Sequence, residues 1–273
     1  MEAMGFPSLR PYAGFTATRV VVDAVKYLAV MTAIVLVICK GTASMGYHWQ
    51  WYRVPRYFFG QTPEGFAAGP LLQGLMVTFR ITLISLALAF FVGLVTVLMR
   101  LSSSFSARAV ARGYLELIRN TPLLIQLFFL YFVISPIAGV NAFVSAVIAL
   151  SLFEGAYISE IFRAGIEAVP KGQWEAGLGS GLSVFEAYRF VVLPQAVRNI
   201  LPPLTSQAIS LVKDSALVST IAIYDLSMQG QAIVSETFLV FEIWLTVAAV
   251  YLAITMTLSI LVHRMEARFK RYV

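Results

Sequence analysis

Charge is scarce in this sequence, and long apolar runs take its place. Of the 273 residues only 12% are Asp, Glu, Lys or Arg, whereas 59% are hydrophobic. About a quarter of the residues of a soluble domain are charged, so this composition excludes an ordinary soluble protein. Apolar runs of roughly 20 residues, long enough to cross a bilayer, recur along the chain. Ten-residue segments of alternating polarity, typical of a membrane β-barrel, are absent. The sequence therefore indicates an all-α membrane protein with several spans.

Cysteine and histidine are almost missing. The single cysteine, Cys39, cannot form a disulfide or a cysteine metal site within one chain, and we interpret it as a small apolar residue. His48 and His263 are too few and too far apart in the sequence to build a metal site. No constellation of nucleophile and base is present, and no G-x-x-x-x-G-K-[ST] phosphate loop occurs. We therefore expect no enzyme activity, no metal and no cofactor in this chain.

Six candidate spans can be placed on the apolar runs. They cover about residues 20–39, 71–98, 123–137, 142–161, 203–224 and 237–262. Lys and Arg gather before the first span, after the second, after the fourth and at the end of the chain. With six spans, all four clusters fall on one side, and the excess of Lys and Arg marks that side as cytoplasmic. We therefore expect both termini in the cytoplasm.

Two regions of the chain differ in character. Residues 1–70 comprise a tail, an extra helix that we interpret as an uncleaved anchor, and an external loop rich in Trp, Tyr and Phe. That loop has two interpretations: aromatic rings at the lipid interface, or a landing site for an external partner. Residues 71–273 form the main membrane domain, which includes a polar cytoplasmic loop at 164–198.

The polar cytoplasmic loop is expected to fold into two short helices. Pro170 ends the preceding helix, and residues 173–180 suit a short helix whose apolar edge includes Trp174 and Leu182. Gly181 fits the left-handed position after a helix end. Ser183 and Glu186 have the spacing of a capping box for a second helix. The spacing is equally compatible with a hairpin that rests on the lipid headgroups.

Four motifs in this order resemble those of one transporter family. Glu175-Ala176-Gly177, then Gly181, then Val191-x-Leu193-Pro194 resembles the EAA loop of ATP-binding-cassette importer permeases, with Gly177 and Val191 where Ala and Ile are usual. Three further stretches resemble the polar amino-acid permeases of that family: Tyr114–Leu124, Gly155–Gln173 and Lys213–Leu217. The resemblance extends from about residue 71 to the C-terminus.

The resemblance implies a fold, a set of partners and a docking site. The fold would be the five-helix core of a type I importer, here with one additional N-terminal helix, in the bacterial inner membrane. The partners would be two ATPase subunits that hold ATP and Mg²⁺, a second permease subunit, identical or related, and a periplasmic or lipid-anchored substrate-binding protein. The residues that contact the ATPase would be Trp174, Glu175, Ala176, Gly177, Gly181 and Leu182.

Charged residues within predicted spans are candidates for a substrate site, because burying charge in a membrane is costly. Lys213 and Asp214 lie about ten residues into the fifth span, roughly 15 Å deep, and could bind the carboxylate and ammonium of an amino acid with Ser215. Glu154 has a comparable depth and could bind a cationic group. Gln126 and Tyr157 are further pocket candidates. Alternatively, these charges pair with one another as structure, and an ion-coupled transporter or channel would also explain them.

Overall fold

The computed structural model describes residues 17–44, 46–62 and 65–269. The described part of the chain divides after Trp49 into two compact units. The first unit contains α1 (Ala17–Ser44), a helix of 28 residues that includes the predicted first span. The predicted positions of both termini lie outside the described residues, as does the Cys39 side chain. The boundary predicted at residue 70 remains a prediction.

The second unit begins with short elements that the sequence did not predict. Two single-turn 3₁₀ helices, η1 (Trp51–Arg53) and η2 (Pro55–Tyr57), precede an antiparallel hairpin of β1 (Phe59–Thr62) and β2 (Gly65–Ala68), in which Phe59 pairs with Ala68. The backbone N–H of Gly69 then donates to the carbonyl of Phe58 at 2.7 Å, which closes the segment at the start of the next helix.

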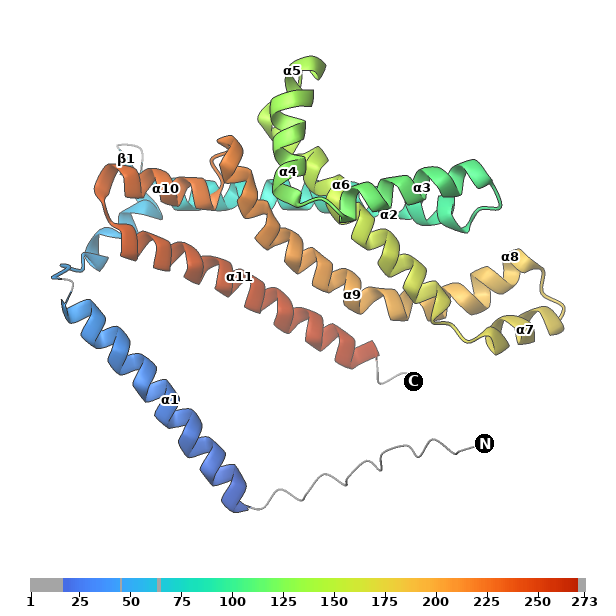
Figure 1. Cartoon of the computed structure of the whole chain (residues 1–273), viewed down its shortest axis with the longest axis horizontal. Coiled ribbons are helices and arrows are strands. Elements are labelled where there is room, and N and C mark those ends of the chain that lie inside the picture. The colour runs from blue at the N-terminus through green and yellow to red at the C-terminus, as the bar shows by residue number, and fades with distance from the viewer. Residues whose placement is uncertain (1–16, 45, 63–64, 270–273) are drawn as a thin grey trace, which may run out of the picture. The chain divides into compact units, whose positions relative to one another are not determined.

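Two long helices pack against each other at the centre of the second unit (Figure 1): α2 (Pro70–Leu101) and α6 (Ala142–Glu167). They approach closely because small residues face each other. A Cβ on Gly93 would lie 2.7 Å from Ile158 Cγ2, and a Cβ on Gly155 would lie 2.7 Å from Val92 Cγ1. Small residues at helix contacts are typical of membrane bundles, where close backbone packing replaces the hydrophobic effect.

The segment between α2 and α6 is broken rather than straight. Here α3 (Phe105–Arg119) meets α4 (Leu123–Phe128), the π-helical η3 (Phe129–Ile134) and α5 (Ser135–Ala138) at an angle of 105°. Pro122 lies at the corner. Proline has no N–H for a continued helix and disfavours helical geometry at the residue before it, so the helix breaks there. The span predicted at 123–137 is one arm of this bent pair.

The fifth span begins about ten residues earlier than predicted. After α7 (Lys171–Gly179), α8 (Val184–Ala187) and the π-helical η4 (Tyr188–Val192), α9 runs over Leu193–Asp214 and continues as the 3₁₀ helix η5 (Ser215–Ile221). The predicted start at residue 203 was wrong because Pro202 and Pro203 lie inside α9. Proline is tolerated inside membrane helices where neighbouring groups satisfy the freed carbonyls. Here the Thr205 hydroxyl donates to the carbonyls of Leu201 and Pro202 at 3.0 and 2.7 Å.

The chain ends with α10 (Leu226–Thr237) and α11 (Val240–Phe269). By length and composition, three described helices can cross a membrane: Pro70–Leu101, Ala142–Glu167 and Val240–Arg264, with a fourth if the bent pair is one span. The more polar α9 is not among them. The predicted total of six spans therefore remains a prediction, whereas the helical membrane architecture is confirmed.

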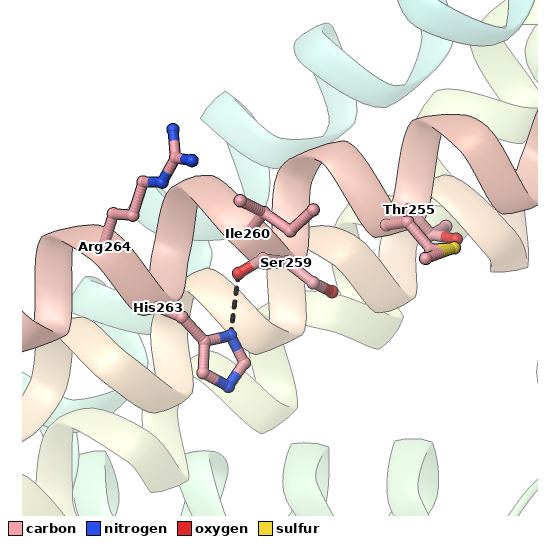
Figure 2. Close-up of a pocket in the computed structure, with 6 residues that line it drawn as sticks. Thr255, Ser259, Ile260, His263 and Arg264 are labelled. Atoms are coloured by element: carbon pink, nitrogen blue, oxygen red, sulfur yellow. Dashed lines mark hydrogen bonds between the residues drawn. The ribbon is translucent and has the colours of Figure 1, made fainter.

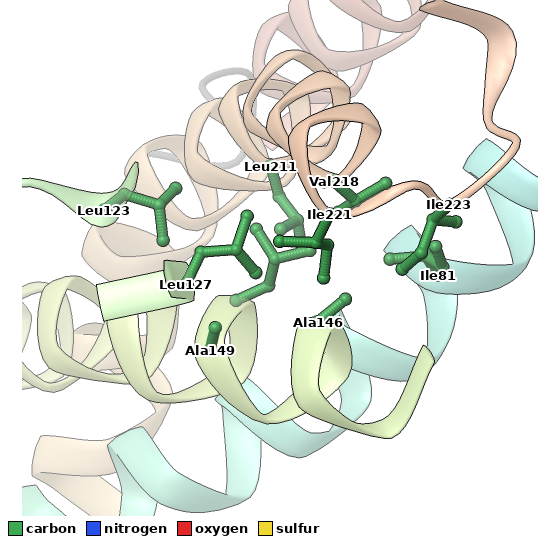
Figure 3. Packing of buried hydrophobic residues seen from close by; sticks show 10 residues of the cluster. Ile81, Leu123, Leu127, Ala146, Ala149, Leu211, Val218, Ile221 and Ile223 are labelled. Carbon is green, nitrogen blue, oxygen red and sulfur yellow. The ribbon is translucent and has the colours of Figure 1, made fainter. Parts of the chain in front are cut away.

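The largest core cluster joins α2, α4, α6, α9 and η5. Its residues are shown in Figure 3 and include Ile81, Leu127, Leu150, Leu211 and Ile221, all at most 2% exposed. Because these side chains come from five elements far apart in sequence, their burial fixes α9 and η5 against the α2–α6 pair. That packing also sets the depth of the charged residues at the end of α9.

Two arginines of α2 mark the limits of the apolar band. Arg80 stacks on the ring of Phe143 at 5.2 Å, near the start of α6, and Arg100 pairs with Glu160 at 2.9 Å, near its end. No charged residue lies between Arg80 and Arg100 in the sequence. Their separation of 20 residues corresponds to about 30 Å of helix, the thickness of a bilayer's hydrocarbon core. The uncharged segment between them is therefore long enough to cross that core, and it lies within the candidate span Pro70–Leu101.

Candidate functional site

The polar cytoplasmic loop folds as a rigid hairpin of α7 and α8, which lie together beyond the ends of α6 and α9 (Figure 1). Gly181 adopts φ +86°, and the Ser183–Glu186 capping box is complete, with Ser183 N donating to Glu186 Oε2 at 2.8 Å. Both expectations for this turn are thus confirmed. The hydrogen bonds from the Ser183 N–H and hydroxyl hold the pKa of the Glu186 carboxyl below its usual value.

Trp174 and Gly177 hold the hairpin together. The Trp174 ring meets the Tyr188 ring edge-to-face at 4.7 Å between centroids, a favourable aromatic geometry. Gly177 is buried against η4, where an added Cβ would lie 3.4 Å from Val191 and 3.5 Å from Ala187. These contacts explain why a small residue occupies position 177: α7 packs on the following segment at that point.

The other residues predicted to contact the ATPase lie on the surface of the hairpin. Glu175, Ala176 and Gly181 are exposed, and Leu182 is half-buried. Within the part of the chain that the structure describes, Glu175 makes no hydrogen bond or ion pair. An exposed carboxylate on a rigid two-helix hairpin is available to a partner, and a partner in the cytoplasm would reach it without unfolding the loop.

A pair of carboxyl groups, those of Glu154 and the half-buried Asp214, lies where α6 and α9 meet. Glu154 is fully buried, and its Oε2 accepts a hydrogen bond from Gln207 Nε2 at 2.6 Å. The carboxyl groups of Asp214 and Glu154 are close enough to interact through charge and hydrogen bonding. Glu154 lies six residues before Glu160, about 9 Å from the inner limit of the apolar band. The pair is therefore inside the membrane, and Asp214 shares this depth although α9 begins earlier than predicted.

Sequence reasoning grouped six residues here, and the structure brings two of them together, Glu154 and Asp214. Lys213 is exposed on the unit, and Ser215 is buried with its hydroxyl donating to Val212 O at 2.8 Å. The Tyr157 ring rests against Phe153 at 5.1 Å. Gln126 is engaged elsewhere: its amide donates to Ile118 O and to Thr121 O and Oγ1 at 2.7–3.0 Å, closing the α3–α4 bend.

Sequence reasoning missed Gln207, the direct partner of Glu154. The available signal was a polar amide side chain within the predicted fifth span, six residues before Lys213. It also missed most of an ion cluster at the inner end of α2. Glu160 pairs there with Arg100, Arg119 and Arg163 at 2.9, 2.9 and 3.0 Å. The cluster joins α2, α3 and α6.

The last described turns of α11 carry a shallow surface groove (Figure 2). It is lined by Thr255, Met256, Ser259, Ile260, His263 and Arg264. His263 is engaged within its own helix, with Nδ1 2.7 Å from the carbonyl of Ser259. All the lining residues come from a single helix, so the groove is part of the outer surface of this unit and lies apart from the carboxyl pair.

The fold and these two sites define a class of protein: a helical membrane subunit with charged residues between its spans and a polar two-helix hairpin, α7 and α8, which we expect to dock a partner and call the docking hairpin. Residues 95–271 match the family described as "Binding-protein-dependent transport system inner membrane component", and the chain belongs to this family.

Curated relatives agree with this assignment. The chain is 39% identical to the glutamine transport system permease protein GlnP of Escherichia coli K12 over 204 residues, which cover 73% of this chain and 93% of the relative. It is 40% identical to the L-cystine transport system permease protein TcyB of Bacillus subtilis over 207 residues, 75% of this chain and 88% of the relative.

Solved structures share the fold. A chain of an amino acid ABC transporter crystallised with histidines matches with a TM-score of 0.70 and 39% identity, covering 73% of this chain and 94% of that one. A chain of the MetNI methionine ABC transporter matches with a TM-score of 0.63 at 20% identity, and so supports the fold alone. The protein is thus a multi-pass inner-membrane permease component of an ATP-binding-cassette importer, with the type I fold.

Proposed function

We propose that this permease carries polar amino acids into the cell, driven by ATP hydrolysis on a separate subunit. In the proposed complex, two ATPase subunits bind ATP and Mg²⁺, a second permease completes the pathway, and a substrate-binding protein delivers the amino acid. This chain would hold no cofactor of its own. The names of the relatives, which include glutamine and cystine transporters, support an amino-acid substrate.

The main support for coupling between this chain and an ATPase is the rigid hairpin of α7 and α8 with its exposed Glu175. Its contacts at Trp174 and Gly177 make α7 and α8 move as one body. The same chain continues through η4 into α9. A force applied by an ATPase to the hairpin would therefore reach the helix that ends at Asp214.

The substrate role is proposed for the residues around the carboxyl pair. Two interacting carboxyl groups inside a membrane, one of them fully buried, need a proton or a cation to be stable. Asp214 and Glu154 therefore suit the ammonium group of an amino acid, and the adjacent Lys213 suits its carboxylate. Ser215, Tyr157 and Gln126 remain weaker candidates because each makes another contact within the unit.

Coupling is tested with Glu175→Lys in the complete transporter purified from its host. We expect weaker co-purification of the ATPase and loss of ATP-driven uptake, while the permease itself stays folded because Glu175 makes no internal contact. Lys171→Glu, an equally exposed charge reversal in the first turn of α7, is the matched control. Normal assembly and uptake in Glu175→Lys would refute the docking role.

The substrate site is tested by uptake of labelled amino acids into vesicles that contain ATP. Lys213→Ala and Asp214→Ala should each reduce uptake at least tenfold without loss of the ATPase from the complex. Retained uptake in both variants would exclude them from the site. Uptake by the wild type without ATP would instead favour an ion-coupled transporter.

A further inference from the structure

Gln207 joins α9 to α6 beside the carboxyl pair. Its Nε2 donates a hydrogen bond to Oε2 of Glu154 at 2.6 Å. Gln207 and Asp214 are separated by about two helical turns, so they share one face of α9. Leu211, between them, and Leu150, one turn before Glu154, are fully buried in the core cluster of Figure 3. The amide and the carboxyl group therefore meet where apolar packing fixes the two helices against each other.

Within the residues that the structure describes, only one oxygen of the Glu154 carboxyl group has a hydrogen-bond partner. The second, Oε1, has none, although the whole side chain is fully buried. The neighbouring Asp214 carboxyl cannot supply the missing hydrogen while both groups are ionised, because a carboxylate only accepts. A buried acceptor without a donor is unfavourable, and the interior of a membrane offers no bulk water in its place. The site therefore lacks one hydrogen-bond donor.

We propose that Gln207 is a positioning residue for the substrate: it holds the Glu154 carboxyl group by Oε2, so that Oε1 remains for an N–H of the amino acid's ammonium group. Gln207 itself does not touch the substrate. A neutral amide suits this role because it donates a hydrogen bond and leaves the negative charge of the carboxylate uncompensated, whereas Lys or Arg would neutralise it. The inference rests on the proposed substrate role of the carboxyl pair and adds the residue that orients it.

The test measures equilibrium binding to the complete transporter, purified in detergent without its substrate-binding protein. The probe is the labelled amino acid that wild-type vesicles take up fastest in the presence of ATP. Gln207→Met keeps the length of the side chain and removes the donor, so the dissociation constant should rise about tenfold. If Gln207→Met fails to assemble, Gln207→Asn replaces it, since its amide is one methylene too short to reach Oε2.

Gln195→Met is the matched control on the same helix. Gln195 is also a half-buried amide of α9, and its Nε2 donates to the carbonyl of Val191 at 2.9 Å. It lies about 18 Å along the helix from Gln207. Its replacement should therefore change the dissociation constant by less than about twofold, as expected for distant sites.

A second background separates positioning from packing. Glu154→Met removes the carboxyl group that Gln207 is proposed to orient, while Asp214 and Lys213 remain to bind the probe. In that background Gln207→Met should change the dissociation constant by less than about twofold, because its effect depends on Glu154. An equal loss of affinity in both backgrounds, or no loss in either, would overturn the proposal.

Two further outcomes separate this inference from the proposed function. A wild-type transporter that takes up the probe with ATP but does not bind it would overturn the substrate role of the carboxyl pair, and the role of Gln207 with it, while leaving the importer function intact. A wild type that takes up no amino acid with ATP would refute the proposed function itself.

Discussion

Adding one methyl group at Gly177 should stabilise the docking hairpin. Gly177 lies inside α7, where glycine is about 1 kcal/mol less favourable than alanine. Its backbone is in the ordinary helical region, so no left-handed conformation demands glycine there. The space is sufficient, because the new Cβ would meet its nearest neighbour, Val191 Cγ2, at 3.4 Å, an ordinary van der Waals distance.

The expected gain for Gly177→Ala is therefore about 1 kcal/mol in the local stability of α7. Each 1.4 kcal/mol corresponds to a factor of ten in an equilibrium constant, so local opening should become about fivefold rarer. Amide hydrogen exchange measures this opening directly. The amides of Ser180 and Leu182 should report it, since they donate to Ala176 O at 3.0 Å and to Gly177 O at 3.3 Å.

Two other glycines of the same hairpin provide controls. Gly172→Ala adds a methyl group with no atom within 4 Å, and it lies in the first turn of α7, where helices fray, so it should change exchange in the rest of α7 much less. Gly181→Ala should have the opposite effect, because a side chain at φ +86° costs about 1–2 kcal/mol. Faster exchange in Gly177→Ala would refute the reasoning, since it would show that the α7–η4 contact cannot accept the methyl group.

Three further predictions concern other parts of the unit. Glu160→Ala should lower stability by about 2 kcal/mol, because it leaves three arginines without their shared carboxylate; thermal unfolding in detergent measures the loss, and wild-type stability would contradict it. Gly74→Ala should lower the free energy of unfolding by about 1–3 kcal/mol, because its Cβ would lie 2.6 Å from the backbone carbonyl oxygen of Asp225. The control in the same assay is Gly113→Ala, where no atom lies within 4 Å of the added Cβ. The pKa of Glu186 is lower in the folded hairpin than in the unfolded chain, so its contribution to α8 is present above the unfolded pKa and lost as pH falls through the folded pKa; exchange of the Glu186 amide should rise in that acidic range, and an identical rise in Glu186→Gln would disprove the link.

The docking hairpin could be predicted almost residue by residue because its signals are local. A glycine after a helix and a Ser and Glu three residues apart act within one turn, so the sequence alone contains both partners of each interaction. The same local reading failed at the fifth span. Pro202 and Pro203 indicate a break by local rules, but the surrounding helices keep α9 continuous through them.

The carboxyl pair could be predicted only in part. Glu154 and Asp214 were each recognisable as costly charges in a membrane, but their proximity depends on how α6 and α9 cross. Gln207 shows the limit most clearly, since it bonds to a residue 53 positions away and has no unusual neighbours in sequence.

A single helical segment connects the docking hairpin to the carboxyl pair, so a movement of the hairpin can be transmitted along it. From Val184 to Asp214 the chain is helical without a gap, through α8, η4 and α9, and α9 alone is about 33 Å long. Its contacts with α6 include Gly165 against Ile200, near the hairpin, and Glu154 bonded to Gln207, further along the helix. A tilt of α9 imposed at the hairpin would therefore be expected to change the distance between Asp214 and Glu154. A ligand that bridges the two carboxyl groups would resist that change, so substrate occupancy and hairpin position should influence each other through this one helix.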